Sequence, residues 1–260
     1  MTTVTELPTT SDLDGAYTRE VLSRLNELSS DAQAGAYDDA IALMTTAIQR
    51  GGVIQAFGTG HSEAFAMEIA GRAGGLIPTN KIALRDVVLR GSLDVEALGG
   101  STLERNPSVA DELYELTSPG ENDVFVIASN SGVNGSIVGL ALAAKKHGHP
   151  IIAVTSIEHT MKVEPKHSSG KRLRDVADVV IDNKAPFGDA TIELVDGIPV
   201  GAVSSITAAF IAQILTIGVA RSIASTGATP PLYISANIPG GDEHNLALEA
   251  KYTNKIRRDA

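Results

Sequence analysis

The 260-residue chain contains no cysteine and no tryptophan, and aromatic residues make up only 4% of it. Without cysteine there is no disulfide scaffold, no thiolate nucleophile and no cysteine-based metal or iron–sulfur site. The usual signature of an oxidising compartment is missing as well. Residues 1–11 contain neither Lys nor Arg and no apolar run, so we expect no secretory signal and a cytoplasmic protein.

Basic residues are fewer than acidic ones: 21 Lys and Arg and 31 Asp and Glu give a formal net charge of −10. A general nucleic-acid binder needs a net basic face, so we expect no nucleic-acid partner. Residues 197–220 carry no charge and are long enough to span a bilayer. Several polar residues and Pro199 dilute this stretch, so we expect a helix buried in a soluble protein and no membrane partner.

Short β-branched apolar runs alternate with polar turns along the chain, and helical patterns follow most of them. Four such runs lie at residues 53–57, 124–128, 151–154 and 179–181. This alternation is typical of βαβ units on a parallel sheet that is covered on both faces. Residues 80–84 are a weaker strand candidate, and residues 89–121 show no regular pattern.

The domain organisation is expected to be simple, because the sequence has no internal repeat and no low-complexity linker. We expect a flexible N-terminus at residues 1–15 and one domain over residues 16–260. Its predicted parts are N-terminal helices in 16–50, a sheet core in 51–225 and a C-terminal loop and helix in 226–260. Apolar spacing and glycine content predict helices over 16–28, 37–49, 62–73, 136–147, 201–225 and 246–255, and a glycine-rich loop at 238–245.

Two turns rich in Gly and Ser follow the predicted strands at 53–57 and 124–128. The first ends in Gly60, His61 and Ser62, and the second, at residues 128–136, contains three hydroxyls, two amides and two glycines. Ligands of open parallel sheets bind at the carboxyl ends of strands, where free N–H groups at helix starts favour an anion. Each turn alone could be an ordinary polar turn, but the two together favour ligand binding.

Familiar cofactor and metal motifs are absent from the sequence. The glycines at 58 and 60 lack the third glycine of a dinucleotide-binding fingerprint, and no phosphate-binding loop with Gly-Lys-Ser/Thr occurs. The six histidines show no metal-binding spacing. We therefore expect no NAD, ATP or other cofactor and no metal.

The order of the motifs resembles the SIS (sugar isomerase) domain family. The residues that carry this resemblance lie at 58–62, 68–72, 129–132, 167–173 and 235–245. It covers residues 28–252 and is closest to single-domain bacterial SIS proteins. It implies an α/β fold, namely a three-layer α-β-α sandwich with a five-stranded parallel sheet, N-terminal helices and a long buried C-terminal helix. It also implies a homodimer or homotetramer with a phosphosugar site at the strand ends.

In that family a Ser-x-Ser-Gly-x-Thr loop holds the sugar phosphate. Ser129, Ser131 and Gly132 match this loop, whereas Asn134 stands where Thr is usual. The departure leaves open whether the anion is a phosphate or a sulfonate. The other candidate substrate-binding residues are Gly60, His61, Ser62, Arg72, Asn130 and Lys171.

An aldose–ketose isomerase needs a base near C1 and C2 of the sugar and a group that opens its ring. Glu68 is the candidate base, because related heptose-phosphate isomerases of the SIS family carry a catalytic Glu in a similar stretch. Its alternative role is an ion pair with Arg72, four residues along a helix. His244 is the candidate for ring opening, since histidine passes protons near neutral pH. A structural role at a helix start is its alternative.

The sequence therefore predicts an isomerase that interconverts the aldose and ketose forms of a 6-phosphorylated or 6-sulfonated sugar through an enediolate. Two other functions fit the same anion-binding loops. One is a non-catalytic phosphosugar sensor, and the other is a SIS-type etherase on a phosphorylated amino sugar.

Overall fold

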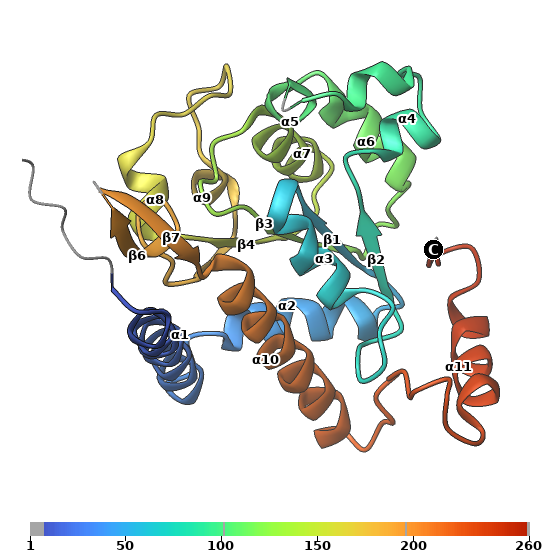
Figure 1. Ribbon diagram of the computed structural model, residues 1–260. Helices are drawn as coiled ribbons and strands as arrows, with labels where there is room; N and C mark the ends of the chain where they lie inside the picture. The colour runs from blue at the N-terminus through green and yellow to red at the C-terminus, as the bar shows by residue number, and fades with distance from the viewer. Residues whose placement is uncertain (1–7, 101, 196, 259–260) are drawn as a thin grey trace, which may run out of the picture.

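The computed structural model describes residues 8–100, 102–195 and 197–258. Its centre is a five-stranded parallel sheet with the strand order β2-β1-β3-β4-β5 (Figure 1). The strands are β1 (Ile54–Gly58), β2 (Thr79–Ile82), β3 (Val124–Ala128), β4 (Ile151–Thr155) and β5 (Val179–Asp182). The predicted α/β class and the five-stranded parallel sheet are confirmed, with small shifts at the strand ends.

The central strands are largely apolar, and β3 is apolar throughout, because both faces of the sheet are covered. In β3, Val124 and Val126 belong to one core, whereas Phe125 and Ile127 belong to the other. Successive side chains of a strand point to opposite faces, so a strand buried on both sides needs apolar residues at every position. This explains why the sequence shows continuous apolar runs instead of alternation.

Helices on both faces complete three layers (Figure 1). The first core is covered by α2 (Asp38–Gln49), α3 (Glu63–Ile69) and α10 (Ser204–Ser225). The second core is covered by α4 (Asp86–Leu89), α5 (Thr102–Arg105), α6 (Val109–Thr117), α7 (Gly135–Lys146) and α9 (Leu173–Val176). The 3-10 helices η1 (Gly60–Ser62) and η2 (Val95–Leu98) and the helix α8 (Ile157–Lys162) lie in the connections.

The first helix, α1 (Thr10–Gln33), begins inside the stretch that was expected to be flexible. Thr9 forms a capping box with Asp12: Asp12 N donates to Thr9 Oγ1, and Thr9 N donates to the Asp12 carboxylate, both at 3.3 Å. Residues 10–15 of the segment predicted to be flexible are thus helical, and residues 1–7 lie outside the described residues. The apolar spacing starts only near Val21, whereas the cap sets the helix start much earlier.

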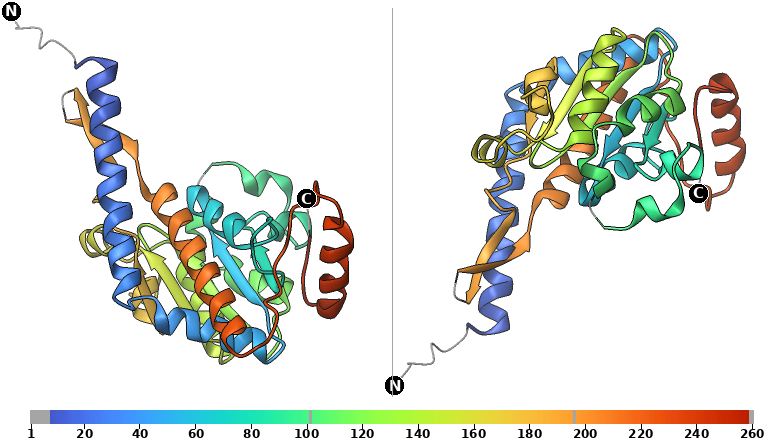
Figure 2. Two further views of the ribbon diagram at one scale, coloured as in Figure 1. Left: turned by 90° about the horizontal axis from the view of Figure 1, so that it is seen from below. Right: turned by 90° about the horizontal axis from the view of Figure 1, so that it is seen from above.

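Two strands that the sequence did not predict, β6 (Ala190–Val195) and β7 (Ile198–Ala202), form an antiparallel hairpin. The hairpin and α1 project together from the body of the molecule as an arm (Figure 2). Tyr17 Oη on α1 donates to the carbonyl of Ala202 at 2.6 Å. The exposed apolar side chains of the hairpin are Leu194, Val195, Ile198 and Val200.

The long helix α10 starts at Ser204, because the first part of the uncharged stretch belongs to the hairpin. Its length and composition would also suit a membrane span, but in the fold it packs against α1, α2 and α3. Ile211, Leu215 and Val219 are buried in the first core. The predicted burial holds for this face only, because Ile206 and Ile217 are 39% and 65% exposed.

The glycine-rich segment 238–245 is a loop only up to its glycines, so this prediction is corrected. Helix α11 (Gly241–Glu249) begins at the second glycine and is followed by the 3-10 helix η3 (Ala250–Tyr252). A Cβ on Gly241 would lie 2.1 Å from the carbonyl oxygen of Ser235, so the glycine permits a close approach at a helix start instead of a turn. The predicted terminal helix at 246–255 is thus displaced towards the N-terminus.

Candidate functional site

The loops that follow β1 and β3 meet at one edge of the sheet. Gly58, the last residue of β1, is paired with Ala128, the last residue of β3. Residues 59–62 form what we call the first loop, and residues 129–134 form the second loop. Both lie at the carboxyl ends of the strands, where ligands of this sheet architecture bind.

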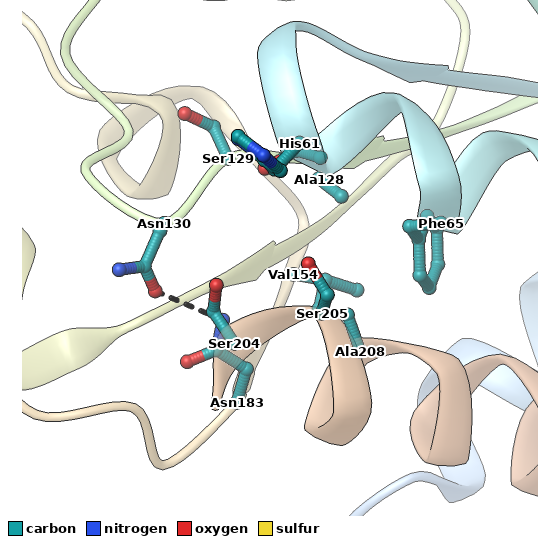
Figure 3. Close-up of a pocket in the computed structure, with 11 residues that line it drawn as sticks. His61, Phe65, Ala128, Ser129, Asn130, Val154, Asn183, Ser204, Ser205 and Ala208 are labelled. Atoms are coloured by element: carbon teal, nitrogen blue, oxygen red, sulfur yellow. Dashed lines mark hydrogen bonds between the residues drawn. The ribbon is translucent and has the colours of Figure 1, made fainter. Parts of the chain in front are cut away.

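A small recess lies between the two loops and the start of α10 (Figure 3). Its polar lining consists of His61, Ser62, Ser129, Asn130, Asn183, Ser204 and Ser205. Its volume is about 10 Å³, which is room for one water molecule. Pockets for larger ligands measure roughly 300–1,000 Å³, so a ligand larger than a small polar group has to extend over the loops.

The second loop is held in shape by its own hydrogen bonds. Gly132 N donates to Ser129 Oγ at 3.1 Å, and Asn183 Nδ2 donates to Asn130 Oδ1 at 3.1 Å. Gly132 has a φ of 63°, which favours glycine. The hydroxyl of Ser131 has no hydrogen-bond partner among the described residues, so it is free to bind a ligand.

The first loop turns back sharply over the end of β1. A Cβ on Gly58 would lie 2.2 Å from the carbonyl oxygen of Ser62. Ser62 stands directly before α3 as expected, but its side chain makes no capping hydrogen bond. In the part of the chain that the structure describes, neither its hydroxyl nor the His61 imidazole has a hydrogen-bond partner. Both side chains line the recess and are available to a ligand.

The candidate base Glu68 is fixed near the recess but does not line it. It lies one turn of α3 beyond Phe65, which is part of the lining. Glu68 Oε1 accepts a hydrogen bond from Gln213 Nε2 of α10 at 2.7 Å and forms an ion pair with Arg72. The alternative that the sequence left open, the ion pair, is therefore formed, and it leaves the Glu68 side chain 23% exposed.

Arg72 faces a second and larger cavity. This cavity measures about 400 Å³ and is lined by Met67, Ala70, Gly71, Arg72, Lys81, Arg257 and Arg258. The side chain of Arg72 is 46% exposed and pairs with Glu68. Glu68 therefore links α3 to α10 on one side and contacts the rim of a basic cavity on the other.

His244 and Lys171 lie apart from the recess. His244 is on α11, and its Nε2 is hydrogen-bonded to the carbonyl of Leu232 at 2.9 Å. Lys171 is exposed, and its backbone N–H donates to Ser169 Oγ at 3.2 Å. Within one chain, the structure does not bring the predicted ring-opening histidine to the predicted base.

Three residues that the sequence reasoning missed complete the recess. Asn183 directly follows β5. Because ligands bind at the carboxyl ends of parallel strands, this position after a predicted strand could have identified it as a candidate. Ser204 and Ser205 begin α10, where Asp189 accepts hydrogen bonds from Ser204 N at 2.8 Å and from Ser204 Oγ at 2.6 Å. Because Asp189 already satisfies the positive end of this helix, Ser205 is the hydroxyl left for a ligand.

His159 on α8 supports the segment that carries Asn183 and Asp189. Its Nδ1 accepts a hydrogen bond from Gly188 N at 2.9 Å, and its ring stacks on Phe187 with the centroids 5.2 Å apart. Burial lowers the pKa of His159 from its ordinary value of 6.5, although nearby Asp189 opposes the shift. The ring is thus neutral at neutral pH, as a hydrogen-bond acceptor has to be.

Comparison with known proteins identifies the family. A family model described as SIS domain matches residues 16–156, which include both loops and Glu68. The chain belongs to the SIS domain family. The match confirms the resemblance found in the sequence.

Two relatives of this SIS protein extend over nearly the whole chain. The UPF0309 protein TTE0306 of Caldanaerobacter subterraneus is 34% identical over 244 residues, covering 93% of this chain and 98% of that protein. The UPF0309 protein lmo0025 of Listeria monocytogenes is 37% identical over 234 residues, covering 89% of this chain and 94% of that protein.

A solved structure is also similar. The phosphoheptose isomerase GmhA from Neisseria gonorrhoeae has a TM-score of 0.51 at 19% identity, covering 84% of this chain and 100% of that one. This last likeness shows a shared fold.

Proposed function

We propose that this SIS protein is an isomerase that interconverts the aldose and ketose forms of a sugar phosphorylated or sulfonated at C6. One observation carries the proposal: three side chains on the two strand-end loops, His61, Ser62 and Ser131, have no hydrogen-bond partner among the described residues. Glu68 lies on α3 one turn beyond Phe65, which lines the recess. The fold shared with a phosphoheptose isomerase supports the same reaction class.

In the proposed reaction, Glu68 takes the proton from C2 of the open-chain aldose and returns it to C1. The proton of the C2 hydroxyl passes to the oxygen on C1, so an enediolate forms and collapses to the ketose. The two hydrogens move within one molecule, so the reaction balances without an oxidant or reductant. Gln213 and Arg72 hold the carboxylate in place, and the hydroxyls of the loops hold the anionic group of the sugar.

Ring opening is assigned to His244 of a second copy of the chain, because His244 lies away from the recess of its own chain. We therefore propose that the protein is a homodimer or homotetramer in which copies complete each other's sites. The exposed apolar side chains of the hairpin, together with Ile206 and Ile217 on α10, support a covered interface.

The remaining proposals concern location and partners. We propose that the protein acts in the cytoplasm on a free sugar metabolite and binds neither nucleic acid nor membranes. The net charge of −10 supports this, since it opposes binding to polyanions and to anionic lipid surfaces.

Proton NMR in D2O tests the isomerase directly. The purified protein is incubated with glucose 6-phosphate, glucosamine 6-phosphate, N-acetylglucosamine 6-phosphate and 6-deoxy-6-sulfoglucose. Loss of the C2 proton signal together with a new ketose is the expected result for one of them. Thermal stabilisation by a sugar without any exchange would contradict the isomerase and favour a sensor.

Replacing Ser129 and Ser131 by alanine is expected to weaken binding of the anionic sugar by about a hundredfold or more, because two hydrogen bonds to a charged group are lost and each costs roughly 1.5–3 kcal/mol. The dephosphorylated sugar, used as a neutral analogue, should lose much less. Isothermal titration calorimetry measures both. The single variant Ser131→Ala separates the two roles, since Ser129 also stabilises the loop through Gly132.

The matched control is the double replacement of Ser222 and Ser225 by alanine at the far end of α10. It removes two hydroxyls without touching either loop and should leave both affinities unchanged. Equal losses for the anionic and the neutral sugar in the Ser129 and Ser131 variant would show that the second loop is structural.

A further inference from the structure

A carboxylate that the proposed mechanism does not use lies between the two loops. Glu104 belongs to the short helix α5, in a region where the sequence shows no regular pattern. Its Oε1 accepts a hydrogen bond from Asn134 Nδ2 in the second loop. Its Oε2 lies on the side of the first loop, because a Cβ on Gly60 would be 3.8 Å from it. One side chain thus reaches from the second loop to the first.

The backbone of Glu104 is fixed against the start of α7. Its carbonyl oxygen accepts a hydrogen bond from Ser136 Oγ at 2.7 Å. A Cβ on Gly135 would lie 2.2 Å from the carbonyl oxygen of Arg105, so only glycine allows the end of α5 to come this close. These contacts place the carboxylate before any ligand arrives, which reduces the entropy lost on binding.

The hydrogen-bonding capacity of this carboxylate is only half used. Within the described ranges, Glu104 Oε2 has no hydrogen-bond partner, and the side chain is partly exposed. An ionised carboxylate only accepts hydrogen bonds, and it repels a phosphate or sulfonate. A bare anion is therefore disfavoured beside it. A sugar hydroxyl or the ammonium of an amino sugar is a donor that a carboxylate binds strongly.

We propose that Glu104 is a specificity-determining residue that accepts a hydrogen bond from a hydroxyl or ammonium group of the sugar, while the loop hydroxyls hold the anionic end. The identity of the ligand as an anionic sugar rests on the proposed function. The substrate then carries, besides its anionic group, a hydrogen-bond donor that reaches Glu104 while the loop hydroxyls hold the anion. The role of Asn134, which stands where the family has Thr, is then to hold Glu104 instead of the anion.

Isothermal titration calorimetry of Glu104→Gln with two kinds of ligand tests this role. Inorganic phosphate should bind about threefold more tightly, because a repulsive charge is removed. The best-binding sugar phosphate of the panel above should bind about tenfold more weakly, because a charge-assisted hydrogen bond is lost. If the donor is an ammonium group, glucosamine 6-phosphate loses more affinity than glucose 6-phosphate. If it is a hydroxyl, the two lose equally.

Opposite changes in affinity for phosphate and for the sugar phosphate would indicate the proposed role of Glu104, since damage to the loop would weaken the binding of both ligands. Glu115→Gln is the matched control, because it removes the same charge from an exposed side chain of α6 and should change neither affinity. If the Glu104→Gln variant binds both ligands more weakly, Glu104 has a structural role. If it binds both more tightly, the carboxylate blocks the site. If neither affinity changes, Glu104 lies outside the site. Each of these overturns the proposal.

The binding measurements do not depend on turnover. If the wild-type protein binds the sugar phosphates but isomerises none of them, the proposed isomerase activity is wrong. The proposed role of Glu104 is then still tested by the changes in affinity. A wild-type protein that binds neither phosphate nor any sugar of the panel would overturn both.

Discussion

Replacing Glu68 by glutamine is expected to reduce turnover by roughly a hundred- to ten-thousand-fold, the usual contribution of a general base. Binding of the anionic sugar should stay within a few-fold of the wild type. Glutamine has nearly the same size and can keep a hydrogen bond with Gln213, but its amide cannot take a proton from carbon. The expected result is therefore a large loss in kcat with little change in affinity, which indicates an interaction made mainly in the transition state.

The geometry around Glu68 makes this result informative. The carboxylate is bound by Gln213 at 2.7 Å and by Arg72, so an ion-pair role and a catalytic role both fit its position. A surface ion pair contributes about 0.2–1 kcal/mol to stability, which is too little to explain a large loss of activity by partial unfolding. Turnover measured by NMR and unfolding measured by circular dichroism separate the two roles.

Glu158→Gln on α8 is the matched control, because Glu158 forms an ion pair with Lys162 at 2.7 Å over the same four-residue spacing. Both variants should lose a similar small amount of stability, and only Glu68→Gln should lose activity. Arg72→Gln, which keeps the carboxylate and removes its partner, should lose far less turnover than Glu68→Gln. Turnover unchanged by Glu68→Gln would remove this residue from the mechanism, and loss of sugar binding would assign it a structural role.

Replacing Gly58 by alanine is expected to lower the free energy of unfolding by about 3 kcal/mol, at the upper end of overpacking effects. The new Cβ would lie 2.2 Å from the carbonyl oxygen and 2.5 Å from the carbonyl carbon of Ser62, and 3.1 Å from Glu63 N. These are backbone atoms, so a side-chain rotation cannot relieve the contact. The first loop has to move away from β1, and His61 and Ser62 move with it.

Urea denaturation measures the stability change, and calorimetry with the sugar phosphates measures the loss of binding. Gly15→Ala is the matched control, because Gly15 lies within α1 and a Cβ there would meet only Arg19 Nη1 at 3.4 Å. Glycine inside a helix costs about 0.5–1 kcal/mol relative to alanine, so this control should be slightly more stable than the wild type. If Gly58→Ala were as stable as the control and bound the sugar normally, the first loop would not be held in the close turn described above.

Local patterns predicted the parts of the site that lie directly after strands. The run at 124–128 is apolar throughout and the run at 53–57 is apolar except for Gln55, because both sheet faces are covered. The ends of these runs mark where polar residues reach the sheet edge. The two loops could therefore be found without a structure. The apolar pattern of the sequence did not predict the hairpin β6-β7. The hairpin projects from the sheet, and its exposed apolar residues resemble the start of the long helix that follows.

The sequence by itself determined the α/β class, the five parallel strands and the polar content of the two loops, since these depend on residues close together in the chain. Tertiary structure alone decided which polar groups meet. The pairing of Gly58 with Ala128 brings the loops together, Gln213 reaches Glu68 from a helix far along the chain, and Glu104 enters from a region without periodicity. His244, by contrast, is hydrogen-bonded to the carbonyl of Leu232 and does not line the recess. Such contacts arise from strand register and helix packing, which no local pattern encodes.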